Sequence, residues 1–148
     1  MEHATFVVER TYDASPDRVF AAWSDPEAKA RWFDGPGAEV EIDFRVGGRE
    51  RRRGTLQDGR AYTFQALYHD IVRARRIVFT YDMLLDETRI SVSVATVQLG
   101  PARAGTRLVF TEQGAFLDGH ATPGEREQGM GSLLDALVAE LRSDRSGA

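Results

Sequence analysis

Residues 122–142 read TPGEREQGMGSLLDALVAELR and predict one amphipathic helix. Thr122 can act as the N-cap, Pro123 suits the first helical position, where no amide donor is needed, and Glu125 completes a capping box. Apolar residues then recur at helical steps, namely Met130, Leu133, Leu134, Leu137, Val138 and Leu141. This apolar face needs a partner inside the fold. Gly129 and Gly131 flank Met130, and we expect them to allow close helix-to-sheet packing rather than a kink or a ligand approach.

The partner is expected to be a β-sheet, because most of the chain between residues 38 and 113 alternates as strands do. A first strand is predicted over residues 5–12. Six more follow as a meander, over residues 40–44, 49–53, 62–68, 77–83, 90–94 and 108–112. Asp58-Gly59 suits a two-residue type I′ hairpin, Asp86-Glu87 supplies another turn, and residues 100–105 are expected to form a loop.

Two short helices are predicted after the first strand. Ser15-Pro16 and Asp25-Pro26 are both start signals, and the second helix ends near Phe33. The order is therefore one strand, two short helices, six strands and a long helix. It predicts an α+β fold in which a curved antiparallel sheet wraps around the C-terminal helix.

Composition limits the possible functions. The 148 residues are expected to form a single domain, 1–148, with residues 143–148 as a frayed tail. The net charge of −4 argues against binding of nucleic acid. The longest apolar run, Val19–Trp23, is far shorter than the ~20 residues that span a membrane. No secretory signal opens the chain, so we expect a cytoplasmic protein.

The familiar catalytic and cofactor motifs are missing from the sequence. It has no cysteine, no phosphate-binding loop, no dinucleotide-binding glycine pattern, no H-E-x-x-H and no G-x-S-x-G. We therefore expect no cofactor and no metal site. Four arginines crowd one strand, namely Arg49, Arg51, Arg52 and Arg53, and alternation splits them between its two faces. A solvated arginine face is expected in preference to an anion site.

One face of the predicted sheet is aromatic and should point toward the long helix. Phe64, Phe79, Tyr81, Val92 and Phe110 are placed on it, and alternation adds Tyr62, Met83 and Glu112. An inward Glu112 can be a general acid or base, a hydrogen-bond anchor for a ligand, or the partner of an arginine. Catalytic residues stay unassigned, with Glu112 and Tyr81 as the candidates. Trp23, with Trp32 and Phe33, can close a cavity mouth or simply pack in the core.

A family resemblance runs along the whole chain. Its motifs are Ser15-Pro16, Val19-Phe20, Ala22-Trp23, Asp25-Pro26, Arg31-Trp32-Phe33, Phe44-Arg45-x-Gly47-Gly48 and Thr111-Glu112-Gln113-Gly114, followed by the amphipathic helix. Together they resemble the SRPBCC, or START-like, superfamily, and within it the branch similar to the C-terminal domain of the activator of the Hsp90 ATPase. The resemblance implies a helix-grip fold, with seven strands around the long helix and a cavity for lipids, sterols, polyketides or other apolar molecules. Many relatives carry a tryptophan after the glycine of the last helix, where this chain has Met130.

The resemblance and the aromatic face together give three hypotheses for function. The first is binding of a small apolar or aromatic molecule by a monomer or homodimer. The second is an enzyme similar to polyketide cyclases or hydratases, using Glu112 with Tyr81 or an inward arginine. The third is a chaperone-associated interaction module. The candidate ligand-binding residues are Trp23, Phe44, Tyr62, Phe64, Phe79, Tyr81, Met83, Val92, Phe110, Glu112, Met130 and Leu134.

Overall fold

The computed structural model describes residues 1–143 and has the α+β helix-grip architecture that the sequence predicts. Its elements are, in order, β1 (Glu2–Tyr12), α1 (Pro16–Ser24), α2 (Pro26–Phe33), β2 (Glu39–Ile42), β3 (Arg49–Thr55), β4 (Ala61–Val72), β5 (Arg76–Leu85), β6 (Thr88–Ala102), β7 (Gly105–Phe116) and α3 (Pro123–Arg142). The seven strands form one sheet in the order β1-β7-β6-β5-β4-β3-β2. Every neighbouring pair is antiparallel.

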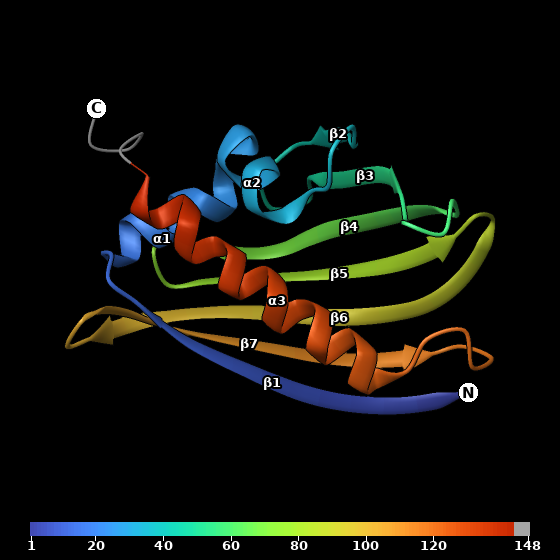
Figure 1. The fold of residues 1–148 in the computed structure, drawn as a ribbon. Coiled ribbons are helices and arrows are strands. Elements are labelled where there is room, and N and C mark those ends of the chain that lie inside the picture. Colours follow the sequence, from blue (N-terminus) through green and yellow to red (C-terminus); the bar gives the residue numbers. More distant parts are fainter. Residues whose placement is uncertain (144–148) are drawn as a thin grey trace.

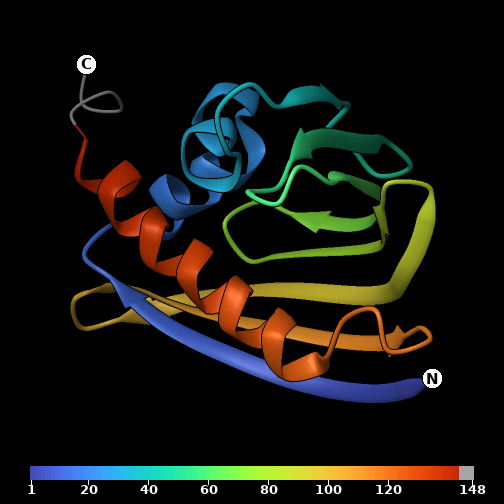
Figure 2. The same ribbon diagram turned by 45° about the vertical axis from the view of Figure 1, so that its right-hand side comes forward.

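Helix α3 crosses the inner face of the curved sheet, and α1 and α2 cover one end of it (Figure 1). The turned view shows the sheet bending around α3 (Figure 2). Met130, Leu134 and Leu137 of α3 are buried, as their spacing predicts. The hydroxyl of Tyr12 on β1 donates a hydrogen bond of 2.8 Å to the carbonyl of Leu134. The apolar face of the helix and the concave face of the sheet thus form one core.

The predicted helix starts are confirmed. The side chains of Ser15 and Asp25 accept hydrogen bonds from the amides three residues on. At the start of α3, Thr122 accepts from the amide of Glu125, and the Glu125 carboxylate accepts from the amide of Thr122. These contacts are local in sequence, which is why the residue pattern reveals them. Ser143 caps the other end of α3, and the rest of the predicted tail, 144–148, lies outside the described residues.

Two loop predictions were wrong. Five residues, 56–60, join β3 to β4. The amide of Leu56 donates to the carbonyl of Arg60, and the amide of Gly59 donates to the carbonyl of Leu56, so the turn is longer than two residues. Gly59 has a φ of 89°, but Asp58 lacks the positive φ that a type I′ turn requires at both central residues. The predicted loop over 100–105 is also shorter than expected. Strand β6 continues to Ala102 and β7 begins at Gly105, so a tight hairpin joins them.

A β-bulge at Ile90 overturns the predicted face of β6. Leu84 pairs with Arg89 and Met83 pairs with Ser91, which leaves Ile90 without a partner on β5. The extra residue inverts the alternation that follows. Ser91 is therefore buried, whereas Val92 is 46% exposed on the outer face of the sheet. The placement of Val92 on the inner face was wrong.

Among residues 1–143 no helix is long and apolar enough to cross a membrane.

Candidate functional site

A cavity of about 450 Å³ lies between the inner face of the sheet and the first half of α3. Its lining comes from the three helices, from strands β4 to β7 and from two loop residues, Leu56 and Ala121. The residues are Trp23, Phe33, Leu56, Tyr62, Phe64, Phe79, Tyr81, Met83, Leu85, Ile90, Phe110, Ala121, Glu125, Arg126, Gly129, Met130 and Leu133. Most of these side chains are apolar or aromatic, so the cavity favours an apolar occupant.

The aromatic wall is built from cross-strand neighbours on β4 and β5. The rings of Phe64 and Tyr81 lie 4.7 Å apart between centroids, and Phe33 of α2 meets Phe64 edge-on at 5.6 Å. These distances are typical of favourable tilted and edge-to-face ring pairs. Each ring fixes the position of the next, so the wall is shaped before any ligand arrives.

Tyr62 borders the cavity because Gly54 leaves room for its ring. The two residues are opposite each other on β4 and β3. A Cβ atom added at Gly54 would lie 2.6 Å from the Tyr62 ring. Only glycine at this position allows the tyrosine to lie across the neighbouring strand. Burial raises the pKa of the Tyr62 hydroxyl, and the Asp34 carboxylate acts in the same direction.

A buried carboxylate lies behind the aromatic wall. Glu112 of β7 has no exposed surface, and its Oε2 atom accepts hydrogen bonds from the hydroxyls of Tyr81 and Ser93, each at 2.7 Å. Arg126 of α3 donates to the same oxygen at 3.2 Å. Oε1 of Glu112 is buried without a hydrogen-bond partner in the described part of the chain. We refer to Tyr81, Ser91, Ser93, Glu112 and Arg126 as the Glu112 cluster.

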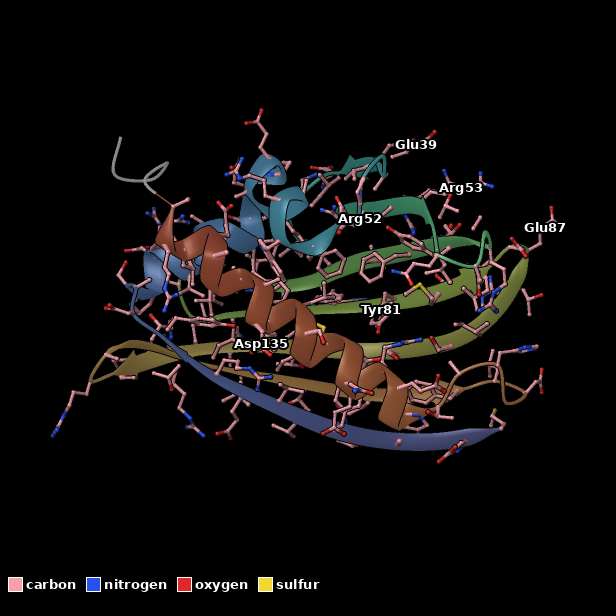
Figure 3. All side chains as sticks on the ribbon, viewed as in Figure 1. Glu39, Arg52, Arg53, Tyr81, Glu87 and Asp135 are labelled. Atoms are coloured by element: carbon pink, nitrogen blue, oxygen red, sulfur yellow. The ribbon has the colours of Figure 1, made fainter. Side chains whose placement is uncertain are left out.

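Arg126 joins the Glu112 cluster to the cavity. Its guanidinium also donates to the hydroxyls of Tyr81 at 2.7 Å and Ser91 at 2.8 Å. The ring of Phe116 lies 5.3 Å from its central carbon, which is within the range of a cation–π contact. Arg126 and Tyr81 both line the cavity, whereas Glu112 does not. Figure 3 shows Tyr81 between the sheet and α3.

The hydroxyl of Tyr81 stays protonated at neutral pH. Burial raises the pKa of Tyr81 well above its ordinary value, and the charge of Glu112 raises it further, although Arg126 opposes both effects. A neutral hydroxyl that donates to Glu112 and accepts from Arg126 can serve as a hydrogen-bonding group at the cavity surface. It can also relay a proton toward Glu112.

A second buried carboxylate, Glu50 of β3, is enclosed completely. Both of its oxygens lie 3.0 Å from the ammonium of Lys29, which is 1% exposed. Arg52 and Tyr68 also donate to Glu50, and Arg52 pairs in addition with Asp34. We refer to these five residues as the Glu50 cluster. Arg52 lies beside α2 in Figure 3.

Aromatic rings separate the Glu50 cluster from the cavity. The ammonium of Lys29 lies 4.7 Å from the centre of the Phe33 ring and 6.0 Å from that of Phe79, and both rings line the cavity. Burial alone would raise the pKa of Glu50, but the positive charges of Lys29 and Arg52, with the hydrogen bonds from Tyr68 and Arg52, lower it to about 2. The expected solvated arginine face was therefore wrong for Arg52, which is buried, whereas Arg49, Arg51 and Arg53 are exposed.

The two glycines of α3 have different surroundings. A Cβ atom at Gly131 would lie 3.1 Å from the guanidinium of Arg10, so the expected close packing is seen there. Gly129 lines the cavity, and a Cβ atom placed on it would meet nothing within 4 Å. The close-packing prediction was wrong for Gly129, which leaves open space at the edge of the cavity.

Eight of the predicted ligand-binding residues line the cavity, namely Trp23, Tyr62, Phe64, Phe79, Tyr81, Met83, Phe110 and Met130. Four do not. Glu112 lies behind Tyr81, and Leu134 is packed in the core. Phe44 lies beyond the end of β2 at Ile42 and meets Phe20 and Tyr68 edge-to-face, and it does not line the cavity. Val92 faces outward.

Sequence reasoning missed Arg126, which is the cation of the site. A signal was present, because Arg126 precedes Met130 by four residues and therefore lies on the buried face of the predicted helix. Lys29 was missed as well, and no local pattern marks it. Among residues 1–143, side chains of histidine, aspartate and glutamate do not gather in a group that could hold a metal ion.

Comparison with solved structures reveals many similar proteins, among which are the following three. Mll3558 of Rhizobium loti is 48% identical, with a TM-score of 0.88, and the match covers 94% of this chain and 97% of that one. A protein of Rhizobium leguminosarum is 47% identical, with a TM-score of 0.90 and 95% coverage of both chains. CalU16 of Micromonospora echinospora shares the fold at 22% identity and a TM-score of 0.67, over 97% of this chain and 79% of its own.

No protein of curated function matches the sequence. The family described as "Activator of Hsp90 ATPase homolog 1-like protein" matches residues 13–142, which is most of the chain. With the helix-grip fold, this match shows that the chain belongs to the Activator of Hsp90 ATPase homolog 1-like family.

Proposed function

We propose that this protein binds a small hydrophobic or aromatic molecule in the cavity and orients it by one polar group at Tyr81 and Arg126. The observation that carries the proposal is an apolar cavity into which the Glu112 cluster presents these two hydrogen-bonding side chains. Sites for small molecules typically combine an apolar lining with a few fixed polar groups. Membership of the family is compatible with the same function, because the helix-grip fold of its members resembles that of the START-like superfamily, for which binding of apolar molecules is expected.

The charges of the cluster favour a neutral ligand with a hydrogen-bond acceptor. Glu112 already balances the charge of Arg126. A guanidinium has five N–H groups, and Arg126 uses three within the cluster, toward Tyr81, Glu112 and Ser91. The two that remain have no hydrogen-bond partner within residues 1–143, and we infer that they donate to a ketone, hydroxyl or amide oxygen of the ligand.

The first experiment is native mass spectrometry of freshly purified protein, followed by extraction and identification of any molecule that co-purifies. We expect a discrete adduct with an apolar body and at least one oxygen. Titration with 4-hydroxybiphenyl, followed by calorimetry, tests the cavity directly. Absence of both an adduct and probe binding would overturn the proposal.

Two tyrosines provide a matched pair of variants. Tyr81 and Tyr68 each donate to a buried glutamate, but only Tyr81 lines the cavity. We expect Tyr81→Phe to weaken binding of 4-hydroxybiphenyl by about three- to tenfold, the value of one hydrogen bond. Tyr68→Phe should leave the affinity unchanged. Equal effects of the two variants would exclude Tyr81 as the orienting group.

A second candidate function is proton transfer on the bound molecule, as in polyketide cyclases or hydratases. The observation in its favour is the hydrogen bond from Tyr81 to Glu112, which connects the cavity surface with a buried carboxylate. Glu112 would act through Tyr81, because it does not reach the cavity itself. The test is to incubate the extracted molecule with wild-type protein and with Glu112→Gln. A change of its mass or structure that requires Glu112 would support an enzyme.

A third candidate is the interaction role that the family's description suggests. The outer face of the sheet carries two exposed valines on β6, Val92 at 46% and Val94 at 38%. An exposed apolar patch is a feature of some protein interfaces. We expect a purified Hsp90 chaperone to bind the wild-type protein, and replacement of both valines by threonine to weaken that binding without changing affinity for 4-hydroxybiphenyl. Absence of binding by the wild type would exclude this candidate.

A further inference from the structure

A β-bulge places one serine of β6 against the cation of the site. Ile90 and Ser91 are consecutive residues, and both are buried. A regular strand would turn them to opposite faces of the sheet, but the extra residue at Ile90 turns both inward. Ile90 lines the cavity, whereas Oγ of Ser91 accepts a hydrogen bond of 2.8 Å from Nη2 of Arg126. The bulge thus supplies a piece of the apolar wall and a buried acceptor at adjacent positions.

The hydrogen bonds of Arg126 are distributed unevenly over its three nitrogens. Nη1 donates to Tyr81 and to Glu112. Within residues 1–143, Nη2 donates only to Ser91, and Nε has no hydrogen-bond partner. The acceptor atoms around the guanidinium together define its plane, because the group is rigid and planar. Ser91 is the acceptor on the Nη2 side, so its hydroxyl prevents the guanidinium from turning about the contacts at Nη1.

The free N–H groups of Arg126 lie next to the contact with Ser91, one on Nη2 itself and the other on Nε. Arg31 shows what this edge of a guanidinium can bind, because its Nε and Nη2 donate to the two oxygens of Glu140 at 2.8 and 2.9 Å. Among residues 1–143 the unpaired side-chain nitrogens that are buried belong to Arg18, Trp23 and Arg52. Nε of Arg126 is not one of them and therefore keeps accessible surface on a side chain that lines the cavity.

We propose that Ser91 is a positioning residue of the binding site, which holds Arg126 so that its free N–H groups favour ligands with an oxygen acceptor. This inference rests on the proposed function and assigns the preference for oxygen to a residue outside the cavity wall. Ser91 does not touch the ligand and acts through the guanidinium. Groups that contact a ligand select it best when their own partners fix their orientation before it binds.

The experiment uses two probes that differ by one oxygen, 4-hydroxybiphenyl and biphenyl, and equilibrium dialysis measures the affinity for each. The wild-type protein should prefer the hydroxy compound by about three- to tenfold, which is the value of one hydrogen bond. In Ser91→Ala this preference should fall to about twofold or less, while the affinity for biphenyl stays unchanged. Ser91→Thr retains the hydroxyl and should retain most of the preference.

The matched control is Thr106→Val, which removes another buried hydroxyl. The Thr106 side chain donates to the carbonyl of Ala14 at 2.6 Å and does not line the cavity. Its loss should leave the preference between the two probes equal to that of the wild type. The control thus separates the loss of a positioned guanidinium from the general effect of losing one buried hydrogen bond.

The outcomes separate this inference from the proposed function. Failure of the wild type to bind either probe would overturn both. A wild-type preference that survives Ser91→Ala would overturn the role of Ser91 alone, and binding in the cavity would stand. An equal loss of affinity for both probes in Ser91→Ala would assign Ser91 to stability only. Equal losses of preference in Ser91→Ala and Ser91→Thr would show that packing at this position matters and its hydroxyl does not, which would also overturn the inference.

Discussion

Glu50 and Glu112 are both buried, at 1% and 0% exposure, and each accepts hydrogen bonds from a tyrosine and an arginine. Around Glu50 two cations face two carboxylates, and aromatic rings cover the group. Around Glu112 the described part of the chain supplies a single arginine, which lines an open cavity together with the tyrosine. One oxygen of Glu112 has no partner in the described residues, whereas both oxygens of Glu50 have at least two.

This comparison teaches that similar residue types can serve folding or binding, depending on whether a member of the cluster reaches a cavity. The Glu50 cluster is closed, so its interactions can contribute only to stability and to the position of α2. The Glu112 cluster keeps two hydrogen-bonding groups at the cavity surface. Substitutions in the Glu50 cluster should therefore change stability, whereas substitutions in the Glu112 cluster should also change ligand affinity.

The largest effect is expected from Glu50→Gln. The change leaves two buried cations, Lys29 and Arg52, with Asp34 as their one carboxylate among the described residues, which should lower the free energy of unfolding by about 3–5 kcal/mol. Urea denaturation measures it. The control is Asp17→Asn, which removes a pair with Arg73 that is 66% and 82% exposed and should have no measurable effect. A loss no greater than that of the control would contradict the assignment of the Glu50 cluster to stability.

The effect of Glu50→Gln should depend on pH. The pKa of Glu50 is about 2 in the folded protein, below its ordinary value of 4.5. A carboxylate with a lowered pKa stabilises the fold above its unfolded-state pKa, and this contribution is lost as pH falls through the folded-state value. The difference in melting temperature between wild type and variant should therefore be constant from pH 7 to about 5 and narrow below about 4.5. A constant difference down to pH 3 would argue against an ionised Glu50.

A smaller loss of stability is expected from Glu112→Gln. Its amide can still accept hydrogen bonds from Tyr81 and Ser93, and the Arg126 side chain is already 13% exposed beside the cavity. We expect a loss of about 1–3 kcal/mol in the free energy of unfolding. The affinity for 4-hydroxybiphenyl should change as well, because Arg126 and Tyr81 lose the group that holds them. A folded variant with unaltered affinity would remove the Glu112 cluster from the binding site.

The smallest change in stability is expected from Gly129→Trp, because the new side chain enters the open space at the edge of the cavity. Gly129 has free space beside it, and tryptophan has a better helix propensity than glycine by about 0.5 kcal/mol. The melting temperature should stay the same or rise slightly, while the indole occupies the cavity and abolishes measurable binding of 4-hydroxybiphenyl. Gly124→Trp, in the first turn of the same helix and away from the cavity, is the control. Unchanged binding by Gly129→Trp would place the ligand elsewhere.

Most of the fold could be predicted from the sequence. Periodicity identified the buried face of α3, and capping residues marked the start of every helix. Both signals depend only on residues within one or two helical turns of each other, so they can be recognised in a single sequence. The alternation of residues on β4, β5 and β7 predicted most of the aromatic residues that line the cavity. In a regular strand successive side chains point to opposite faces of the sheet.

The candidate site could be predicted only in part. The bulge at Ile90 is one extra residue in a pairing between strands, and it moved Val92 to the outer face. Periodicity within β6 carries no sign of it, because the irregularity belongs to the register between two strands. The prediction for Phe44 was wrong for a related reason, since β2 ends before that residue.

The sequence by itself determined the order of the elements, the buried face of the last helix and the aromatic face of the sheet. Only the tertiary structure decided which charged groups meet. Lys29 and Glu50 are separated by 21 residues, Arg126 and Tyr81 by 45, and each pair joins a helix to the sheet. Burial makes such pairs necessary, because an isolated buried charge is too costly, but the identity of the partner depends on how helix and sheet pack.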